Sequence, residues 1–374
     1  MSYSKRVHII SFDVPCPPDY GGVIDVYYKL KALHKAGIRI ILHCFEYGRP
    51  QSEELNKLCE EVFYYPRQTT KSLLFNTLPY IVLSRQSEEL KSNLLKDDAP
   101  ILMEGLHSTF LLTAEEFDHR NIIVRTHNIE HEYYENLAKV ERNIFKRYYF
   151  YNEAGKLKKH ESVLKKAASI AAISSNDKKY YSSLFESVHC ISAFHPFEEV
   201  SYLPGRSDFA FYHGNLSVGE NNEAALFLVN KVFENSQHKL VIAGSKPSSE
   251  LVKAAKLNPA VELLSDQSPE QIYQLIREAQ CNILPTFQST GIKLKLLASL
   301  FSGRFCLVNS PMVIGTGLES LCTIADTAEE MKERLDRIMV MESFPESELI
   351  NRKRILQENF SNAGNAEKLI SLFG

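Results

Sequence analysis

The feature that most constrains the fold is a regular alternation of short apolar runs with longer amphipathic segments. Residues 6–12 (RVHIISF) and 38–44 form two such runs, and the apolar side chains between them recur at helical spacing. A run, a helix and a second run make the β–α–β unit of a parallel sheet. This pattern predicts an α/β fold with buried parallel strands. Further predicted strands in the first half of the chain lie at 100–104, 121–127, 168–174 and 186–192.

A polar segment with two prolines and one glycine, residues 195–207, interrupts the alternation. The pattern then begins again, with predicted strands at 208–214, 238–244, 260–264, 280–285 and 304–309. A chain of 374 residues is long enough for two domains of ordinary size. We therefore expect a first β/α domain over residues 1–195, joined by a C-terminal helix at about 356–374, and a second domain over residues 206–350.

Composition and charge exclude several classes of protein. A formal net charge of −3 gives no indication of nucleic-acid binding. No apolar run reaches the roughly 20 residues of a membrane span, and the first residues are typical of a strand rather than a signal peptide. The seven cysteines are scattered without C-x-x-C spacing, which predicts reduced thiols. We expect a cytoplasmic protein, with peripheral contact at the inner face of the membrane left open.

Several well-known motifs do not occur in the sequence. There is no G-x-G-x-x-G after a strand and no phosphate-binding P-loop, which argues against a dehydrogenase or a P-loop nucleotidase. The chain has no Asp-x-Asp pair, no G-x-S-x-G and no H-E-x-x-H. We therefore expect no catalytic metal and no cofactor.

Glycines follow the first predicted strand of each half, where ligands of open parallel sheets bind. Gly21 and Gly22 directly precede a helix, and Gly214 and Asn215 occupy the turn at the start of the second half. Glycine lets the backbone approach a ligand closely, and amides at a helix start suit phosphate or sugar oxygens. The alternative is that these are plain turns.

His127 ends a predicted strand and is the candidate catalytic residue. A histidine there can bond a sugar hydroxyl or a phosphate, or it can move a proton. The alternative is a structural histidine in front of a helix. Glu104 and His107 occupy the equivalent place after another strand, and with Asn128 they are candidates for contact with an acceptor.

Lys293 and Lys295 lie close to Thr290 and Gly291, where a helix is expected to begin. Free amides at a helix start, together with two lysines, would hold a diphosphate. Residues two apart point to nearly opposite sides of a formed helix, so both lysines reach one ligand only if the first turn is irregular. The alternative is two solvated lysines on an apolar helix.

Residues 142–166 contain eight lysines and arginines mixed with tyrosine and phenylalanine. A basic amphipathic helix can lie on an anionic membrane. The alternative, which the sequence favours, is a long solvated helix with its aromatic side chains packed inward.

The order and spacing of these segments resemble the family-four (group 1) glycosyltransferases. The likeness spans nearly the whole chain and lies in YGGVIDVYYKLKALHKAGIRI, RTHNIEHEYYENLAK, KKAASIAAISSNDKKYY, GNLSVGENNEAALFL and TGIKLKLLASLFSGR. The last segment matches that family's G-[IT]-[RK]-x-K-x-x-E-A-x-x-x-G-[RK] pattern at Lys293, Lys295, Gly303 and Arg304. The resemblance implies the GT-B fold, with two Rossmann-like β/α/β domains facing across a cleft.

The resemblance also implies an activity. It points to a retaining, hexosyl-type transfer from a nucleotide-diphosphate sugar to a glycan or lipid-linked acceptor, without metal, in bacterial surface polysaccharide biosynthesis. The second domain would hold most of the donor, and the first would hold the acceptor and the reacting face. The residues implied for the donor and its diphosphate are Gly21, Gly22, Gly214, Asn215, Thr290, Gly291, Lys293 and Lys295.

The chain departs from the family at one motif. Such enzymes carry an E-x7-E pair, whose places are here taken by Thr290 and Ala298. The lost ribose carboxylate removes a charge-assisted hydrogen bond worth about 1.5–3 kcal/mol. This departure motivates a second hypothesis, a non-catalytic accessory protein that binds a partner transferase or a glycan. Another enzyme of the same fold, such as a nucleotide-sugar epimerase or a phosphorylase, is a third and less favoured hypothesis.

Overall fold

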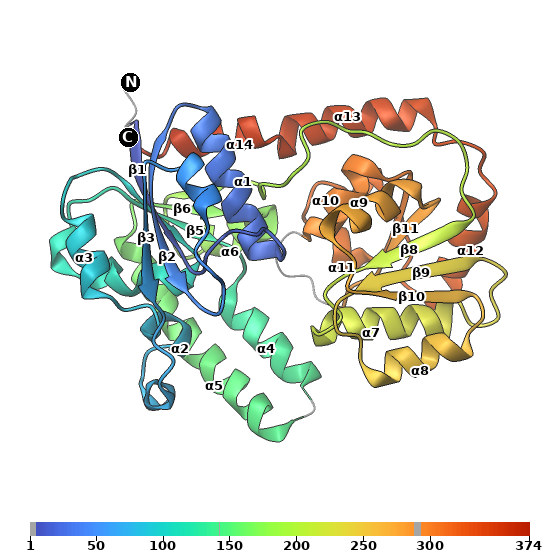
Figure 1. Cartoon of the computed structure of the whole chain (residues 1–374), viewed down its shortest axis with the longest axis horizontal. Helices are drawn as coiled ribbons and strands as arrows, with labels where there is room; N and C mark the ends of the chain where they lie inside the picture. The colour runs from blue at the N-terminus through green and yellow to red at the C-terminus, as the bar shows by residue number, and fades with distance from the viewer. Residues whose placement is uncertain (1–4, 142, 288–292) are drawn as a thin grey trace. The chain divides into compact units, whose positions relative to one another are not determined.

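The computed structural model describes residues 5–141, 143–287 and 293–374, which divide into two compact units. Unit 1 contains residues 5–196 and 359–374, and unit 2 contains residues 197–287 and 293–358. Each unit is built on one sheet whose neighbouring strands all run parallel (Figure 1). The predicted two-domain, Rossmann-like α/β fold is confirmed.

The sheet of unit 1 has seven strands in the order β3-β2-β1-β4-β5-β6-β7. They are β1 (Arg6–Ser11), β2 (Arg39–Glu46), β3 (Glu61–Pro66), β4 (Ile101–Glu104), β5 (Ile122–Thr126), β6 (Ser169–Ala172) and β7 (Val188–Cys190). The apolar runs of the sequence predicted all of these except β3. The apolar run of this edge strand, residues 62–65, is short, half of it is tyrosine, and it is only partly buried.

Two hydrophobic cores lie on the two faces of this sheet. Ile9 packs with the inner face of α1, whereas its neighbour Ile10 belongs to the opposite core, because successive side chains of a strand alternate between faces. Helix α1 forms because Val23, Val26, Leu30 and Leu33 share one face, and it ends just before Gly37, whose φ is 81°. The helices and 3₁₀ turns of unit 1 are α1 (Gly21–Lys35), η1 (Glu53–Lys57), η2 (Lys71–Phe75), α2 (Tyr80–Leu83), α3 (Glu88–Leu94), η3 (Leu106–Thr113), η4 (Glu115–Phe117), α4 (Glu130–Val140), α5 (Ile144–His160), η5 (Glu161–Lys166), α6 (Ser175–Ser182) and α14 (Asn362–Ile370).

The sheet of unit 2 has six strands in the order β10-β9-β8-β11-β12-β13. They are β8 (Phe209–His213), β9 (Lys239–Gly244), β10 (Val261–Ser265), β11 (Cys281–Leu284), β12 (Phe305–Val308) and β13 (Thr323–Ile324). The five longer strands were predicted, and the two-residue β13 was not.

The helices of unit 2 begin at clear sequence signals. Both α9 and α12 start with a capping box, formed by Ser268 with Gln271 and by Thr327 with Glu330. The helices and turns are α7 (Gly219–Phe227), the π-helical η6 (Leu228–Val232), α8 (Ser249–Leu257), α9 (Pro269–Glu278), α10 (Leu294–Ser302), α11 (Ser310–Val313), η7 (Glu319–Leu321), α12 (Ala328–Met339) and α13 (Glu346–Phe360).

The polar end of the chain forms two helices, α13 and α14. The buried Arg352 of α13 donates to the carbonyls of Gly303 and Arg304 in unit 2, at 2.8 and 2.7 Å. In α14, the Asn362 amide pairs with the backbone of His195, which ties this helix to unit 1. None of the helices within the described residues is both long and apolar enough to cross a membrane.

Candidate functional site

The order of the strands marks one place for a ligand in each sheet. In chain order, β2 and β3 are added on one side of β1, and β4 to β7 are added on its other side. The order in which strands are added to the sheet therefore reverses between β1 and β4. In unit 2 it reverses between β8 and β11. Ligands of such sheets bind beyond the carboxyl ends of the strands at this reversal. Of the predicted site residues, Glu104 is the last residue of β4, Gly214 directly follows β8, and Gly21 begins α1, the helix after β1.

In unit 2, the two lysines converge on the start of α7. Lys293 precedes α10, with φ −84° and ψ 108°, so it is not yet helical. Its Nζ lies 3.5 Å from Glu220 Oε1, and Lys295 Nζ donates to Asn221 Oδ1 at 2.9 Å. Because Lys293 stands outside the helix, the two side chains reach adjacent residues. Thr290 and Gly291 lie outside the described residues.

The ammonium group of Lys295 is held in a poorly solvated place. It lies 5.1 Å from the centre of the Tyr212 ring and 2.9 Å from Asn221 Oδ1. Desolvation lowers the pKa of Lys295 to about 8, although Glu220 acts in the opposite direction. Burial and the nearby Lys295 charge lower the pKa of His213 to about 3, so this imidazole is neutral. An anion bound next to Lys295 would offset the solvation free energy that its ammonium group loses on burial.

Gly214 and Asn215 shape the turn between β8 and α7. A Cβ on Gly214 would lie 3.0 Å from Asn221 Cγ, which explains the glycine by packing. The Asn215 Oδ1 atom accepts from Ser217 N and Oγ, at 3.1 and 2.6 Å, and from Ser245 Oγ at 3.2 Å. Its backbone carbonyl accepts from Asn221 Nδ2 at 3.0 Å. These two residues therefore hold the turn that brings Asn221 to Lys295.

Sequence reasoning missed Glu220 as a functional candidate. Its Oε1 accepts from the Thr286 hydroxyl and faces Lys293. In contrast, Ala298 is buried in the core of unit 2 with Phe211 and Val241, so position 298 does not face a ligand. Glu220 thus places a carboxylate at the reversal point of unit 2. The sequence comparison had indicated only that the two carboxylates of the E-x7-E pair are missing. A glutamate in the first turn of a helix that follows a strand was the available signal.

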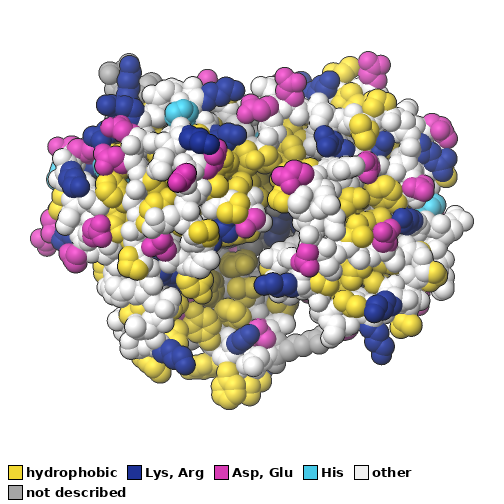
Figure 2. Space-filling model, viewed as in Figure 1, with side chains coloured by type: hydrophobic (Ala, Val, Ile, Leu, Met, Phe, Trp, Pro, Cys, Tyr) yellow, Lys and Arg dark blue, Asp and Glu magenta, His cyan; other side chains and the backbone are white. Residues whose placement is uncertain are grey.

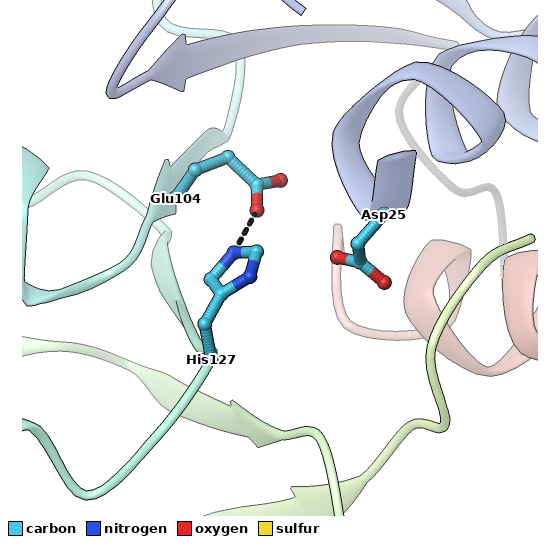
Figure 3. Close-up of side chains that lie close together, drawn as sticks. All are labelled: Asp25, Glu104 and His127. Carbon is cyan, nitrogen blue, oxygen red and sulfur yellow. Dashed lines mark hydrogen bonds and ion pairs between the residues drawn. The ribbon is translucent and has the colours of Figure 1, made fainter. Parts of the chain in front are cut away.

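In unit 1, a buried network of charged side chains surrounds His127. Lys29 Nζ donates to both oxygens of Glu104, at 2.7 and 2.8 Å, and to Asp25 Oδ2 at 2.8 Å. Arg125 Nη2 donates to Asp25 Oδ1 at 3.0 Å. His127 Nε2 lies 2.9 Å from Glu104 Oε2 (Figure 3). Of the five side chains, only that of His127 is partly exposed.

The network fixes where protons sit. Burial opposes the ionisation of Asp25, but Arg125 and Lys29 hold its pKa well below the usual range. Burial likewise opposes the ionisation of Glu104, whereas Lys29 keeps its pKa below the ordinary value. An ionised carboxylate can only accept hydrogen bonds, so His127 Nε2 carries a proton. When the ring is neutral, Nδ1 is therefore its free acceptor.

Three of these side chains carry atoms of the kinds that bind metal ions. Atoms of Asp25, Glu104 and His127 that could act as ligands lie within 4.8 Å of one another, and the three side chains are drawn in Figure 3. However, the ammonium of Lys29 and the guanidinium of Arg125 already bind the two carboxylates. Two fixed cations at this place oppose a third positive charge. We interpret the cluster as a charge network that orients His127.

Gly22 and His107 are explained by packing around Phe12. A Cβ on Gly22 would lie 2.7 Å from Phe12 Cζ, so the glycine lets α1 approach this ring. The Phe12 ring contacts the rings of His107 and His127, with centroids 5.4 Å apart in each pair. Gly21 is exposed at the first position of α1. Of the two glycines, Gly21 is thus the one open to a ligand.

A second acid–base pair lies next to this network. Glu130, the first residue of α4, is buried, and desolvation with the nearby Glu161 and Asp177 raises its pKa to about 8. Burial also lowers the pKa of His107 well below its ordinary value. His107 Nδ1 and Glu130 Oε1 are 3.9 Å apart, and neither atom has a hydrogen-bond partner among the described residues. Asn128, next to His127, is partly exposed, and its carbonyl accepts from Tyr181 at 3.1 Å.

Comparisons with known protein sequences give a distant relative but no family. No family model matches the chain. A Klebsiella pneumoniae protein described as an uncharacterized 44.6 kDa protein in the cps region is 28% identical over 333 residues, which cover 83% of this chain and 84% of that protein.

Solved structures resemble the chain over almost its full length. TarM has a TM-score of 0.69 and 10% identity, with 99% of this chain and 98% of TarM covered. A glycosyltransferase from Rickettsia africae has a TM-score of 0.63 and 12% identity, with 98% and 97% covered. An Escherichia coli structure described as trehalose-6-phosphate bound with UDP-2-fluoro glucose has a TM-score of 0.62 and 12% identity, with 98% of each chain covered. At such low identity, these likenesses show the fold alone.

Proposed function

We propose that the chain is a glycosyltransferase that moves a sugar from a nucleotide-diphosphate donor to a glycan or glycolipid acceptor. The observation that carries this proposal is the convergence of Lys293 and Lys295 on the start of α7, where the strand order of unit 2 reverses. Two ammonium groups beside a helix start suit a diphosphate, whose negative charge grows as the glycosidic bond breaks. No metal or cofactor is needed in this proposal, because the lysines supply the positive charge.

In the proposed donor site, Glu220 has two roles. Its carboxylate partly neutralises Lys293 in the absence of ligand, so a bound diphosphate would compete with it for this ammonium. A carboxylate released in this way accepts hydrogen bonds from sugar hydroxyls. Thr290 and Ala298 have no carboxylate and cannot replace it in this role. The donor-side residues of unit 2 thus become Lys293, Lys295 and Glu220.

In the proposed reaction, His127 is the catalytic residue. Its partly exposed ring is oriented by Glu104, so Nδ1 is left to bond the acceptor hydroxyl or the transferred sugar. Glu104 is fully buried and acts through His127 rather than by contact with the acceptor. Asn128, which is partly exposed, remains a candidate for acceptor contact, as does His107.

We also propose a family, a stereochemical outcome and a biological process for this transferase. Membership of family four, retention of configuration and a hexosyl donor follow from the sequence resemblance. The Klebsiella protein belongs to a cps region by its description, which supports a process in surface polysaccharide synthesis. We further propose a cytoplasmic location with peripheral contact between residues 142–166 and the inner face of the membrane.

A second candidate function is a non-catalytic accessory protein. It is favoured by Ala298, which lies in the core, and by the ion pair of Glu220 with Lys293, which reduces the positive charge of the donor site. Such a protein would bind a partner transferase or a glycan without turning over a donor.

The test is thermal unfolding with UDP, GDP, ADP and CMP and with their common sugar conjugates, followed by donor turnover. We expect one nucleotide diphosphate to raise the Tm of the native chain, and Lys295→Met to abolish the shift. Lys253→Met, at an exposed position of α8, is the matched control and should keep it. If a folded sample shows no shift with any nucleotide, the transferase proposal is wrong and the accessory function is favoured. A shift without turnover of any donor, with or without acceptors, would also favour it.

A further inference from the structure

The α4–α5 hairpin presents an apolar surface that unit 1 does not cover. The two helices run side by side in opposite directions (Figure 1). Tyr134 of α4 packs against Phe150 of α5, with ring centroids 5.9 Å apart, and Ala154 and Leu157 are buried. The sequence favoured inward packing of the aromatic side chains of this segment. That prediction is correct for Phe150 and wrong for the residues at the start of α5.

Four large apolar side chains at the start of α5 are exposed. The exposed fractions are 62% for Ile144, 80% for Phe145, 76% for Tyr148 and 49% for Tyr151. At 100° per residue, these positions fall on one side of the helix. Figure 2 shows hydrophobic side chains gathered at the end of this hairpin. A contiguous apolar patch of this kind indicates an interaction surface, whereas single exposed apolar residues do not.

The charges on this side of α5 are all positive. Arg147, Lys158 and Lys159 are exposed, and helical spacing places them on the same side as Tyr148 and Tyr151. The one acidic residue of α5, Glu153, is fully buried on the opposite side. An apolar start followed by lysines, with no acid among them, is complementary to a negatively charged apolar medium.

We propose that this side of α5 docks on an anionic lipid bilayer. Ile144, Phe145 and the two tyrosines enter the interface, and Arg147, Lys158 and Lys159 contact the lipid headgroups. Tyrosine is suited to this depth because its ring is apolar and its hydroxyl is hydrated. The proposal deepens the membrane contact proposed for residues 142–166 and rests on that contact, not on sugar transfer. Arg142 lies outside the described residues and has no part in it.

The absence of tryptophan from the chain allows a direct test. Tyr148→Trp introduces a single emitter on the proposed surface. Leu257→Trp, at a position of α8 in unit 2 that is 75% exposed, is the matched control. With vesicles that contain phosphatidylglycerol, we expect a blue shift of the emission at position 148 and none at position 257. Vesicles of phosphatidylcholine alone should produce a much smaller shift, and added salt should reduce binding.

Sedimentation with vesicles gives a second, independent measurement. The Ile144→Ser/Phe145→Ser double variant changes only exposed side chains, so its Tm should equal that of the native chain. We expect its vesicle partition coefficient to fall by about tenfold or more, because two large apolar side chains no longer leave water. A Lys253→Gln/Lys256→Gln variant in unit 2 should bind as the native chain does.

Three results would overturn the proposal. Sedimentation without a shift at position 148 would mean that another surface binds the membrane. No sedimentation would remove the membrane contact altogether, and it would leave the nucleotide-binding test of the transferase unaffected. Light scattering that shows a dimer, lost in the serine variant, would mean that the patch joins two copies of the chain.

Discussion

The ring of His127 donates through Nε2 to the carboxylate of Glu104 at 2.9 Å, at the carboxyl edge of the sheet in unit 1. Glu104 is ionised at this buried place because both of its oxygens are bound by Lys29. The orientation and the tautomer of the histidine therefore depend on a lysine that does not touch it. These successive contacts from Lys29 through Glu104 to His127 link the function of a partly exposed residue to the stability of the core.

Replacement of Glu104 by glutamine should allow His127 to adopt either neutral tautomer. Glutamine can present either its oxygen or its amide group, so both neutral forms of the ring become accessible, whereas the native carboxylate permits only Nε2–H. Nitrogen-15 spectra of histidine-labelled protein would detect the change, with His127→Asn used for assignment. We also expect a loss of about 1–3 kcal/mol in unfolding free energy, because Lys29 loses an ionised partner.

The matched control is Glu161→Gln, which alters the equivalent 2.9 Å contact of His131. It should change the signal of His131 and leave that of His127 as in the native chain. An unchanged spectrum of His127 in the Glu104 variant would contradict the role assigned to this carboxylate.

Lys295→Met should stabilise the free protein and abolish nucleotide binding. Burial lowers the pKa of Lys295 from 10.5 to about 8, which corresponds to a cost of about 3 kcal/mol for the charged form in the folded state. Below pH 8 this cost is fully present, and it shrinks as the pH rises towards 10.5, because the folded state then releases its proton before the unfolded state does. Urea unfolding should show an advantage of the variant that is largest at neutral pH and declines above about pH 8. An advantage independent of pH would contradict this account.

Binding of a nucleotide diphosphate should take up protons near pH 8. An anion next to Lys295 favours its charged form and raises its pKa, so molecules that lacked the proton acquire it. Calorimetric titration at pH 8 in two buffers of different ionisation enthalpy would measure the uptake. At about pH 7 the lysine is already largely charged and the terminal phosphate, with a second pKa of about 6, is largely ionised, so the difference between buffers should become small. Equal heats in both buffers at pH 8 would show that the diphosphate does not bind at Lys295.

Much of the fold could be predicted because buried parallel strands are continuous apolar runs. The two strands that were missed give a weaker signal. β3 (Glu61–Pro66) is a partly buried edge strand whose short apolar run is half tyrosine, and β13 (Thr323–Ile324) has two residues. The start of α10 was expected near Gly291 and lies at Leu294 in the described residues. Because α10 begins after Lys293, the side chains of Lys293 and Lys295 can reach the adjacent residues Glu220 and Asn221.

The candidate site was harder to predict because its contacts join distant parts of the chain. Lys29 lies on α1, which packs against β1, and Glu104 lies on β4, which pairs with β1; Arg125 reaches Asp25 from β5. The one local signal was the spacing of Asp25 and Lys29, four residues apart on an otherwise apolar side of α1. Glu220 was overlooked because a glutamate at a helix start is usually explained by the helix dipole.

Glu130→Gln should stabilise the protein increasingly as the pH rises. Burial with Glu161 and Asp177 nearby raises the pKa of Glu130 from 4.5 to about 8, so the folded state keeps a proton that the unfolded state loses. The stability that this group contributes is complete below pH 4.5 and is lost as the pH rises towards 8. Glutamine does not titrate, so the variant should gain up to about 3 kcal/mol over the native chain by pH 7. Urea unfolding between about pH 5 and 8 would measure the difference, with the exposed Glu329→Gln of α12 as control. A difference that does not grow with pH would show that Glu130 is ionised in the folded protein.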